Sequence, residues 1–126
     1  MDKSIKIVIM LLCVPLLILG FKSIFMPMEM TMMLGVDPVG ANGLNTIRGH
    51  LGGSFVAGAL LLLIGLWRNN TSWFLAAGVL MFTIALGRMM SFGLDGVDPA
   101  SLPPFVVELV ITGMMVLAHK RFSQSN

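Results

Sequence analysis

Residues 44–67 read LNTIRGHLGGSFVAGALLLLIGLW, and this stretch decides the fold class. A helix rises ~1.5 Å per residue, so this segment is long enough to cross the ~30 Å hydrocarbon core of a bilayer. The apolar second half of the segment has no charged residue. Arg48, in the first half, is the only arginine or lysine in residues 44–67. The segment is therefore predicted to be a membrane-spanning helix that carries one cation near one end.

Three other apolar segments resemble it in length and composition, at 5–25, 73–92 and 102–119. The chain is 56% hydrophobic and 11% charged, whereas soluble domains carry about 25% charged residues. We therefore expect an all-α polytopic membrane protein, folded as an antiparallel four-helix bundle in a single transmembrane domain (1–126). A loop at 26–43 would join the first two helices on the outer side of the membrane.

The charged residues predict an orientation. With both termini inside the cell, the inner side carries most of the cations: Lys3, Lys6, Arg68, Lys120 and Arg121. Most of the acids then lie outside, and the positive-inside rule favours this arrangement in the bacterial inner membrane. The cations are scattered rather than gathered into a basic patch, so no nucleic-acid partner is expected.

Charge enters three of the apolar segments at a similar depth. Arg48 and Glu108 each lie one to two helical turns below the outer ends of their segments, and Arg88 lies ~8 Å below the outer surface. Charged side chains in a membrane normally face protein, a cavity or a ligand. We therefore predict a polar cluster in the outer half of the protein, made of Arg48, Arg88, Glu108 and Asp95, with support from Asn45 and Ser91.

Two interpretations of this cluster remain open and are compatible with each other. In the first, the charges form ion pairs that fix the helix register, Glu108 with one arginine and Asp95 with the other. In the second, an arginine is left to hold an anionic group, because the planar guanidinium suits carboxylate and phosphate.

Small residues predict where helices approach closely. Gly49, Gly53 and Ala57 are spaced four apart, which is typical of a small-residue ridge for helix packing in membranes. Gly52 lies beside Arg48 on the helical wheel, so the arginine is expected to face the bundle interior.

The chain resembles a family of small bacterial four-helix membrane proteins of unknown function, distantly similar to the DoxX-like group. The resemblance covers nearly the whole chain and rests on three motifs: Asn45-x-x-Arg48-Gly49-x-x-Gly52-Gly53, then Gly87-Arg88-x-x-Ser91-x-x-x-Asp95-Gly96, then Glu108. It implies a four-helix bundle with Arg48, Arg88, Asp95 and Glu108 as signature positions. It implies no activity, although DoxX-like proteins suggest accessory-subunit or membrane-chaperone roles by analogy.

Two other features of the sequence suggest further chemistry. Met28, Met30 and Met32 alternate along the chain, so in an extended segment their thioethers could bind Cu(I); adaptable apolar packing is the alternative. Glu108 could act as a general acid or base on a lipid, as in an isomerase. No phosphate-binding, nucleophile-base or zinc motif is present in the sequence, and no cofactor is predicted.

The first prediction of function is binding of a lipid or other amphiphile with an anionic head group at the polar cluster. The alternatives are an accessory or chaperone subunit whose charges are structural, and a small lipid-modifying enzyme. The partners expected are membrane lipid, and either further copies of the chain or another membrane protein.

Overall fold

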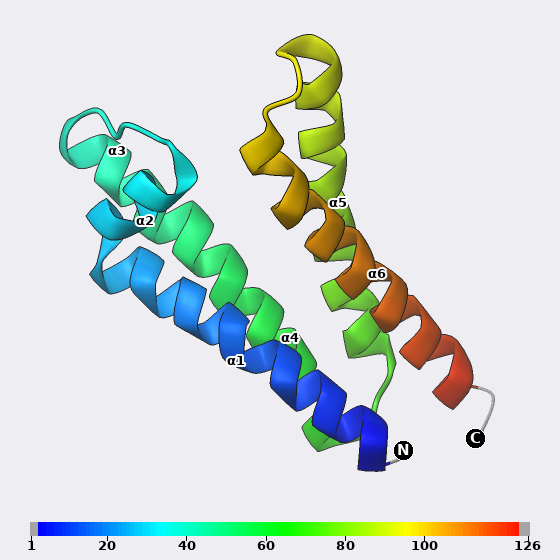
Figure 1. Cartoon of the computed structure of the whole chain (residues 1–126). Helices are drawn as coiled ribbons and strands as arrows, with labels where there is room; N and C mark the ends of the chain where they lie inside the picture. The colour runs from blue at the N-terminus through cyan, green and yellow to red at the C-terminus, as the bar shows by residue number, and fades with distance from the viewer. Residues whose placement is uncertain (1–2, 124–126) are drawn as a thin grey trace. The chain divides into compact units, whose positions relative to one another are not determined.

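A computed structural model describes residues 3–123 of the chain, so the ends of the predicted 1–126 domain lie outside the described residues. The described residues form helices joined by short connections, with no strand among them. The chain divides into two compact units, one up to Leu63 and the other from Ile64 onward. Each unit is built around a pair of long helices (Figure 1).

The N-terminal unit begins with α1 (Lys3–Phe25), a long helix that contains Pro15. Two short helices follow, α2 (Pro27–Leu34) and α3 (Gly40–Thr46). The chain then continues without a break through a π-helical turn, η1 (Ile47–Gly52), into α4 (Gly53–Arg68).

Contacts between α1 and the η1–α4 segment show that these two stretches run antiparallel. A Cβ built on Gly20 would lie 2.7 Å from Val56 Cγ2, and one built on Gly52 would lie 2.6 Å from Ile24 Cγ1. Further along α1, the buried Cys13 thiol lies 3.9 Å from the carbonyl oxygen of Ala59. Residue numbers thus rise on one helix as they fall on the other, and the helices meet closely where glycine leaves room.

The C-terminal unit is an antiparallel pair of α5 (Ser72–Leu94) and α6 (Leu102–Ser123), joined through the 3-10 turn η2 (Pro99–Ser101). At one end the rings of Phe92 and Phe105 meet edge to face, 5.2 Å apart. At the other end His119 Nδ1 lies 3.2 Å from Thr71 Oγ1. The buried side chains recur every three or four residues, as expected for one helix face: Phe74, Ala77, Met81, Ala85, Ile111, Met115 and Ala118.

Four helical segments are long and apolar enough to cross a membrane: Lys3–Phe25, Gly40–Arg68, Ser72–Leu94 and Pro99–Arg121. They correspond to the four predicted segments, each extended by a few residues at one or both ends. The prediction of an all-α membrane protein with four spans is therefore confirmed. The prediction that all four form a single domain stays a prediction.

The loop predicted at 26–43 is wrong as a description of local structure, because it contains α2 and the first half of α3. Pro27 begins α2, where its missing N–H costs nothing. Gly35 ends it in the left-handed conformation, with φ of 65° and its N–H directed to the carbonyls of Met32 and Thr31. These are ordinary start and stop signals for a helix, and the many prolines and glycines concealed them.

Within the N-terminal unit, the predicted packing ridge is not the surface that meets α1. A Cβ on Gly49 or Gly53 would meet nothing within 4 Å, and Ala57 is exposed. Gly52 instead makes the close approach to α1. The π-helical turn adds a residue to the local repeat, so a wheel drawn for a regular α-helix assigns these faces incorrectly.

Candidate functional site

The strongest polar contact in the C-terminal unit joins its two long helices. Nε of Arg88 on α5 lies 3.0 Å from Oε1 and 3.1 Å from Oε2 of Glu108 on α6. The Arg88 side chain is 32% exposed and that of Glu108 is 13% exposed. Both carboxylate oxygens of Glu108 accept from the same N–H of Arg88. The positive charge of Arg88 therefore neutralises Glu108, the most buried acid described in this unit.

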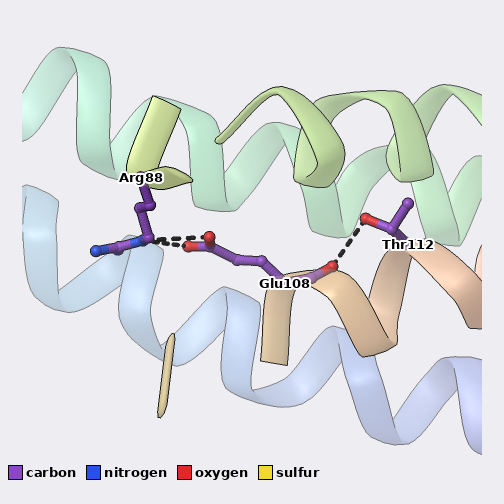
Figure 2. A network of polar contacts seen from close by, with 3 residues as sticks. All are labelled: Arg88, Glu108 and Thr112. Carbon is purple, nitrogen blue, oxygen red and sulfur yellow. Dashed lines mark hydrogen bonds and ion pairs between the residues drawn. The ribbon is translucent and has the colours of Figure 1, made fainter. Parts of the chain in front are cut away.

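Thr112 ties the same turn of α6 to α5. Its hydroxyl lies 2.8 Å from the backbone carbonyl oxygen of Glu108, one turn earlier (Figure 2). The same hydroxyl lies 3.5 Å from the backbone carbonyl oxygen of Gly78 on α5. Gly78 leaves room for this approach, since a Cβ there would lie 3.1 Å from Met115 Cβ. The ion pair is therefore held on two helices that already pack closely.

Only one edge of the Arg88 guanidinium faces Glu108. Its Nε makes the contact, and the end of the group points away from the carboxylate (Figure 2). A guanidinium has five N–H donors in a fixed fork, and the terminal four are the ones that hold carboxylate or phosphate through two parallel bonds. Within residues 3–123 the hydrogen bonds and the ion pair of the Arg88 side chain use its Nε alone. The terminal N–H groups are thus placed to take a further acceptor.

Within the described C-terminal unit the partner of Asp95 is a hydroxyl and not Arg88, and its expected pairing with the other arginine, Arg48, stays a prediction. Asp95 accepts a hydrogen bond of 2.8 Å from the hydroxyl of Ser91, one turn earlier on the exposed end of α5. Its own backbone N–H donates to the carbonyl of Ser91 at 2.7 Å. Asp95 and Ser91 together close the C-terminal end of α5, where the last carbonyls need partners.

Arg48 belongs to the N-terminal unit, where its side chain is exposed, and the expectation that it faces the interior of a four-helix bundle stays a prediction. Its Nη1 donates to the carbonyl oxygen of Ile24, in the last turn of α1. This carbonyl is one of those that the end of a helix leaves without a backbone partner. A cation at this position also interacts favourably with the negative end of the helix dipole. Asn45 is exposed within α3, one turn before Arg48.

Four residues of the predicted cluster lie in the C-terminal unit and two lie in the N-terminal unit. Arg88 and Glu108 form one contact and Ser91 and Asp95 another, both in the C-terminal unit. Arg48 and Asn45 lie in the N-terminal unit. Of the two pairings considered for Glu108, the one with Arg88 is observed.

The predicted Cu(I) ligands do not converge. Met28, Met30 and Met32 lie on the helix α2, where residues two apart point to opposite sides. Met30 is buried, whereas Met28 and Met32 are exposed. Within residues 3–123 no group of three or more histidine, cysteine, aspartate or glutamate side chains is placed to hold a metal ion.

Three features escaped the sequence analysis. The π-helical turn Ile47–Gly52 has no reliable sequence signal, yet such turns often mark functional sites. Asp98 caps η2 by accepting from the N–H of Ala100 at 2.9 Å, and the Asp-Pro dipeptide could have indicated this. Lys22 and Glu29 form an ion pair of 3.5 Å between α1 and α2, which needed α2 to be recognised as a helix.

The fold and the pair define a class: a small α-helical membrane protein with an ionic contact between two of its spans. The model of one family, described as a domain of unknown function (DUF4345), matches residues 4–119, and the chain belongs to that family. This agrees with the predicted resemblance to small membrane proteins of unknown function. No curated protein and no solved structure matches the chain.

Proposed function

We propose that this protein binds an amphiphile through the terminal N–H groups of Arg88, with the apolar tail lying along the membrane-spanning helices. One observation carries the proposal: Glu108 takes the Nε edge of Arg88 and leaves the end of the guanidinium directed elsewhere. The exposed apolar side chain of Met89 is next to Arg88 on α5. A phosphate or carboxylate head group with an alkyl tail fits both features.

The net charge of the Arg88–Glu108 pair limits which kinds of lipid head group can bind well. Arg88 and Glu108 neutralise each other, so a purely anionic ligand would leave one negative charge in excess in a medium of low dielectric constant. A zwitterionic head group avoids this excess, because its phosphate can meet Arg88 while its ammonium group stays on the side of Glu108. We therefore expect a zwitterionic phospholipid to bind more tightly than an anionic one with the same tails.

The proposal includes a location. The four candidate spans and the distribution of lysine and arginine support a protein of the bacterial inner membrane with both ends inside. Arg88 then lies in the outer half of the membrane. A distant relationship to the DoxX-like group belongs to the same proposal and rests on the motifs around Arg48 and Arg88.

The test is native mass spectrometry of the protein released from detergent micelles, with identification of any bound lipid. We compare the unchanged protein with Arg88→Ala and with Arg68→Ala, which removes an exposed arginine at the end of α4. A specific adduct should disappear in Arg88→Ala and persist in Arg68→Ala. Equal adducts in all three proteins would refute the binding site.

Arg88→Ala leaves Glu108 without its partner and could unfold the protein. The double variant Arg88→Gln with Glu108→Gln removes both charges together and keeps similar side-chain volumes, so it avoids a buried unpaired acid. If this double variant is helical and still carries the same lipid as the unchanged protein, Arg88 is not the anchor.

The second candidate is an accessory or chaperone subunit in which the pair is structural. The observation that favours it is the complete use of Glu108: both oxygens face Arg88, and its carbonyl accepts from Thr112. A structural pair predicts that purified protein carries no specific lipid and that Arg88→Ala is unstable. A third outcome concerns Glu108→Gln. If this variant keeps its fold and its bound lipid but no longer converts the lipid, the protein is a lipid-modifying enzyme.

A further inference from the structure

We propose that α2 is an interfacial helix whose methionine stripe, Met28 and Met32, rests on the acyl-chain boundary of the bilayer. The stripe lies in the N-terminal unit, and the proposal does not depend on a ligand at Arg88. It assigns a lipid-contacting surface to the segment 26–43 that the sequence analysis treated as a loop.

The position of α2 in the chain places it at the membrane surface. Only Met26 separates Pro27, its first residue, from Phe25, the last residue of the candidate span α1. Its eight residues extend ~12 Å, which is too short to cross ~30 Å of hydrocarbon. A short helix attached to the end of a span must therefore lie at or near the interface.

The two faces of α2 differ in what covers them. Met30 is 1% exposed and Thr31 is 2% exposed, so this face packs on the unit itself. Met28 is 55% exposed and Met32 is 74% exposed. Residues four apart share one stripe of a helix, so these two thioethers form a continuous apolar surface that the unit leaves uncovered.

The neighbouring surface of α1 identifies the occupant. Phe21 and Phe25 are exposed on the last turns of α1, and their rings stack with centroids 6.1 Å apart. Exposed aromatic side chains on the last turns of a candidate membrane span are suited to contact with lipid. The chain passes from Phe25 through Met26 directly into α2, so an exposed apolar surface at the end of α1 is followed at once by the methionine stripe.

The charged residues on α1 and α2 indicate the depth of α2 in the membrane. Lys22 and Glu29 pair at 3.5 Å, with side chains 46% and 50% exposed. A half-exposed ion pair belongs among head groups and water rather than in hydrocarbon. Glu29 is adjacent to Met28, so the carboxylate can remain at head-group level while the flexible methionine side chains reach toward the acyl chains.

The experiment measures depth with nitroxide spin labels in vesicles of phosphatidylethanolamine and phosphatidylglycerol. Cys13→Ala removes the only cysteine, and a single cysteine is then placed at Met28 or Met32. Leu11→Cys, in the middle of α1, reports the hydrocarbon, and Asp37→Cys, in the connection after α2, reports water. Power saturation compares collisions with oxygen, which concentrates in lipid, against collisions with a water-soluble nickel chelate.

Labels at 28 and 32 should collide more with oxygen than with nickel, giving depth values between those of the Leu11 and Asp37 labels. Nickel accessibility equal to that of the Asp37 label would overturn the proposal. So would low accessibility to both reagents, since that result means protein covers the stripe, as in contact with a second copy. Two label positions are used so that disturbance at one does not decide the outcome, and circular dichroism checks that each labelled protein is helical.

Discussion

Gly52 and Gly53 are adjacent in the sequence and yet differ in their surroundings. A Cβ on Gly52 would lie 2.6 Å from Ile24 Cγ1 and 3.4 Å from the carbonyl oxygen of Gly20, whereas one on Gly53 would meet nothing within 4 Å. Isoleucine is β-branched and stiff, so its Cγ1 cannot swing aside easily.

We expect Gly52→Ala to lower the free energy of unfolding by about 1–3 kcal/mol, because overpacking forces the helices apart. Gly53→Ala should leave it unchanged or raise it by up to about 1 kcal/mol, since alanine favours helix. Thermal unfolding in detergent micelles, followed by circular dichroism, compares the two. Equal midpoints for both variants would show that α1 and η1 do not pack as described.

The Arg88–Glu108 pair should contribute more than the exposed pair of Lys22 and Glu29. Removing one partner of a buried pair leaves an uncompensated charge and costs about 3–5 kcal/mol. We expect Arg88→Met to be destabilised on this scale, and the double variant Arg88→Met with Glu108→Met to be more stable than Arg88→Met alone. Unfolding in detergent by increasing amounts of denaturing surfactant measures these differences.

The matched control is the double-mutant cycle Lys22→Met with Glu29→Met. These side chains are about half exposed, and exposed pairs couple by about 0.2–1 kcal/mol. If the coupling energy of Arg88 with Glu108 is no larger than that of this control pair, the ionic contact between α5 and α6 is not formed in the detergent-solubilised protein.

The partner of Glu108 could be predicted from the sequence better than the partner of Asp95, for physical reasons. Glu108 had to find a cation because a lone carboxylate in a membrane is costly, so its pairing with an arginine was predictable. Which arginine it would find depended on the packing of α5 against α6, and the sequence left that open. Asp95 was assigned to an arginine, but a hydroxyl one turn away on the same helix was a nearer partner.

At the scale of elements, the long helices followed from apolar length, while the short ones did not. A span needs ~20 apolar residues, and four such segments are evident in the sequence. Helices α2 and α3 are short, and their proline and glycine residues serve as caps that resemble loop signals. The π-helical turn Ile47–Gly52 shifts the faces of its residues, so a wheel drawn for a regular α-helix does not give the direction of Arg48.

Arg48 should hold the end of α1 to this π-helical turn. Its contact with the carbonyl of Ile24 supplies a partner that the helix end lacks. We expect Arg48→Ala to speed amide hydrogen exchange at the α1–α2 junction and in η1 by about fivefold, corresponding to about 1 kcal/mol for one hydrogen bond. Hydrogen exchange read by mass spectrometry in detergent measures this directly.

The control for this prediction is Arg68→Ala, which removes an exposed arginine from the last turn of α4. It should leave exchange at the α1–α2 junction unchanged. Identical exchange at that junction in Arg48→Ala and in the unchanged protein would mean that the Arg48 contact does not stabilise the end of α1.

At the scale of the whole molecule, four spans and the charge pattern together determine which connections share a side of the membrane. The connection between α2 and α3 contains Asp37, and the one between α5 and η2 contains Val97. Both should lie outside, whereas the turn before α5, next to Arg68, should lie inside with the other cations. An orientation of this kind follows from the number of spans and the lysine and arginine count, without reference to how the two units pack.

Single cysteines at Asp37, Val97 and Ser72, each in the Cys13→Ala protein, test this topology with a membrane-impermeant maleimide. In right-side-out vesicles the reagent should label positions 37 and 97 and spare 72, and in inside-out vesicles the pattern should reverse. Labelling of 72 alone in right-side-out vesicles would mean that the protein is inserted the opposite way. Labelling of 37 and 97 from different sides would contradict the four spans themselves, because an even number of crossings separates these two positions.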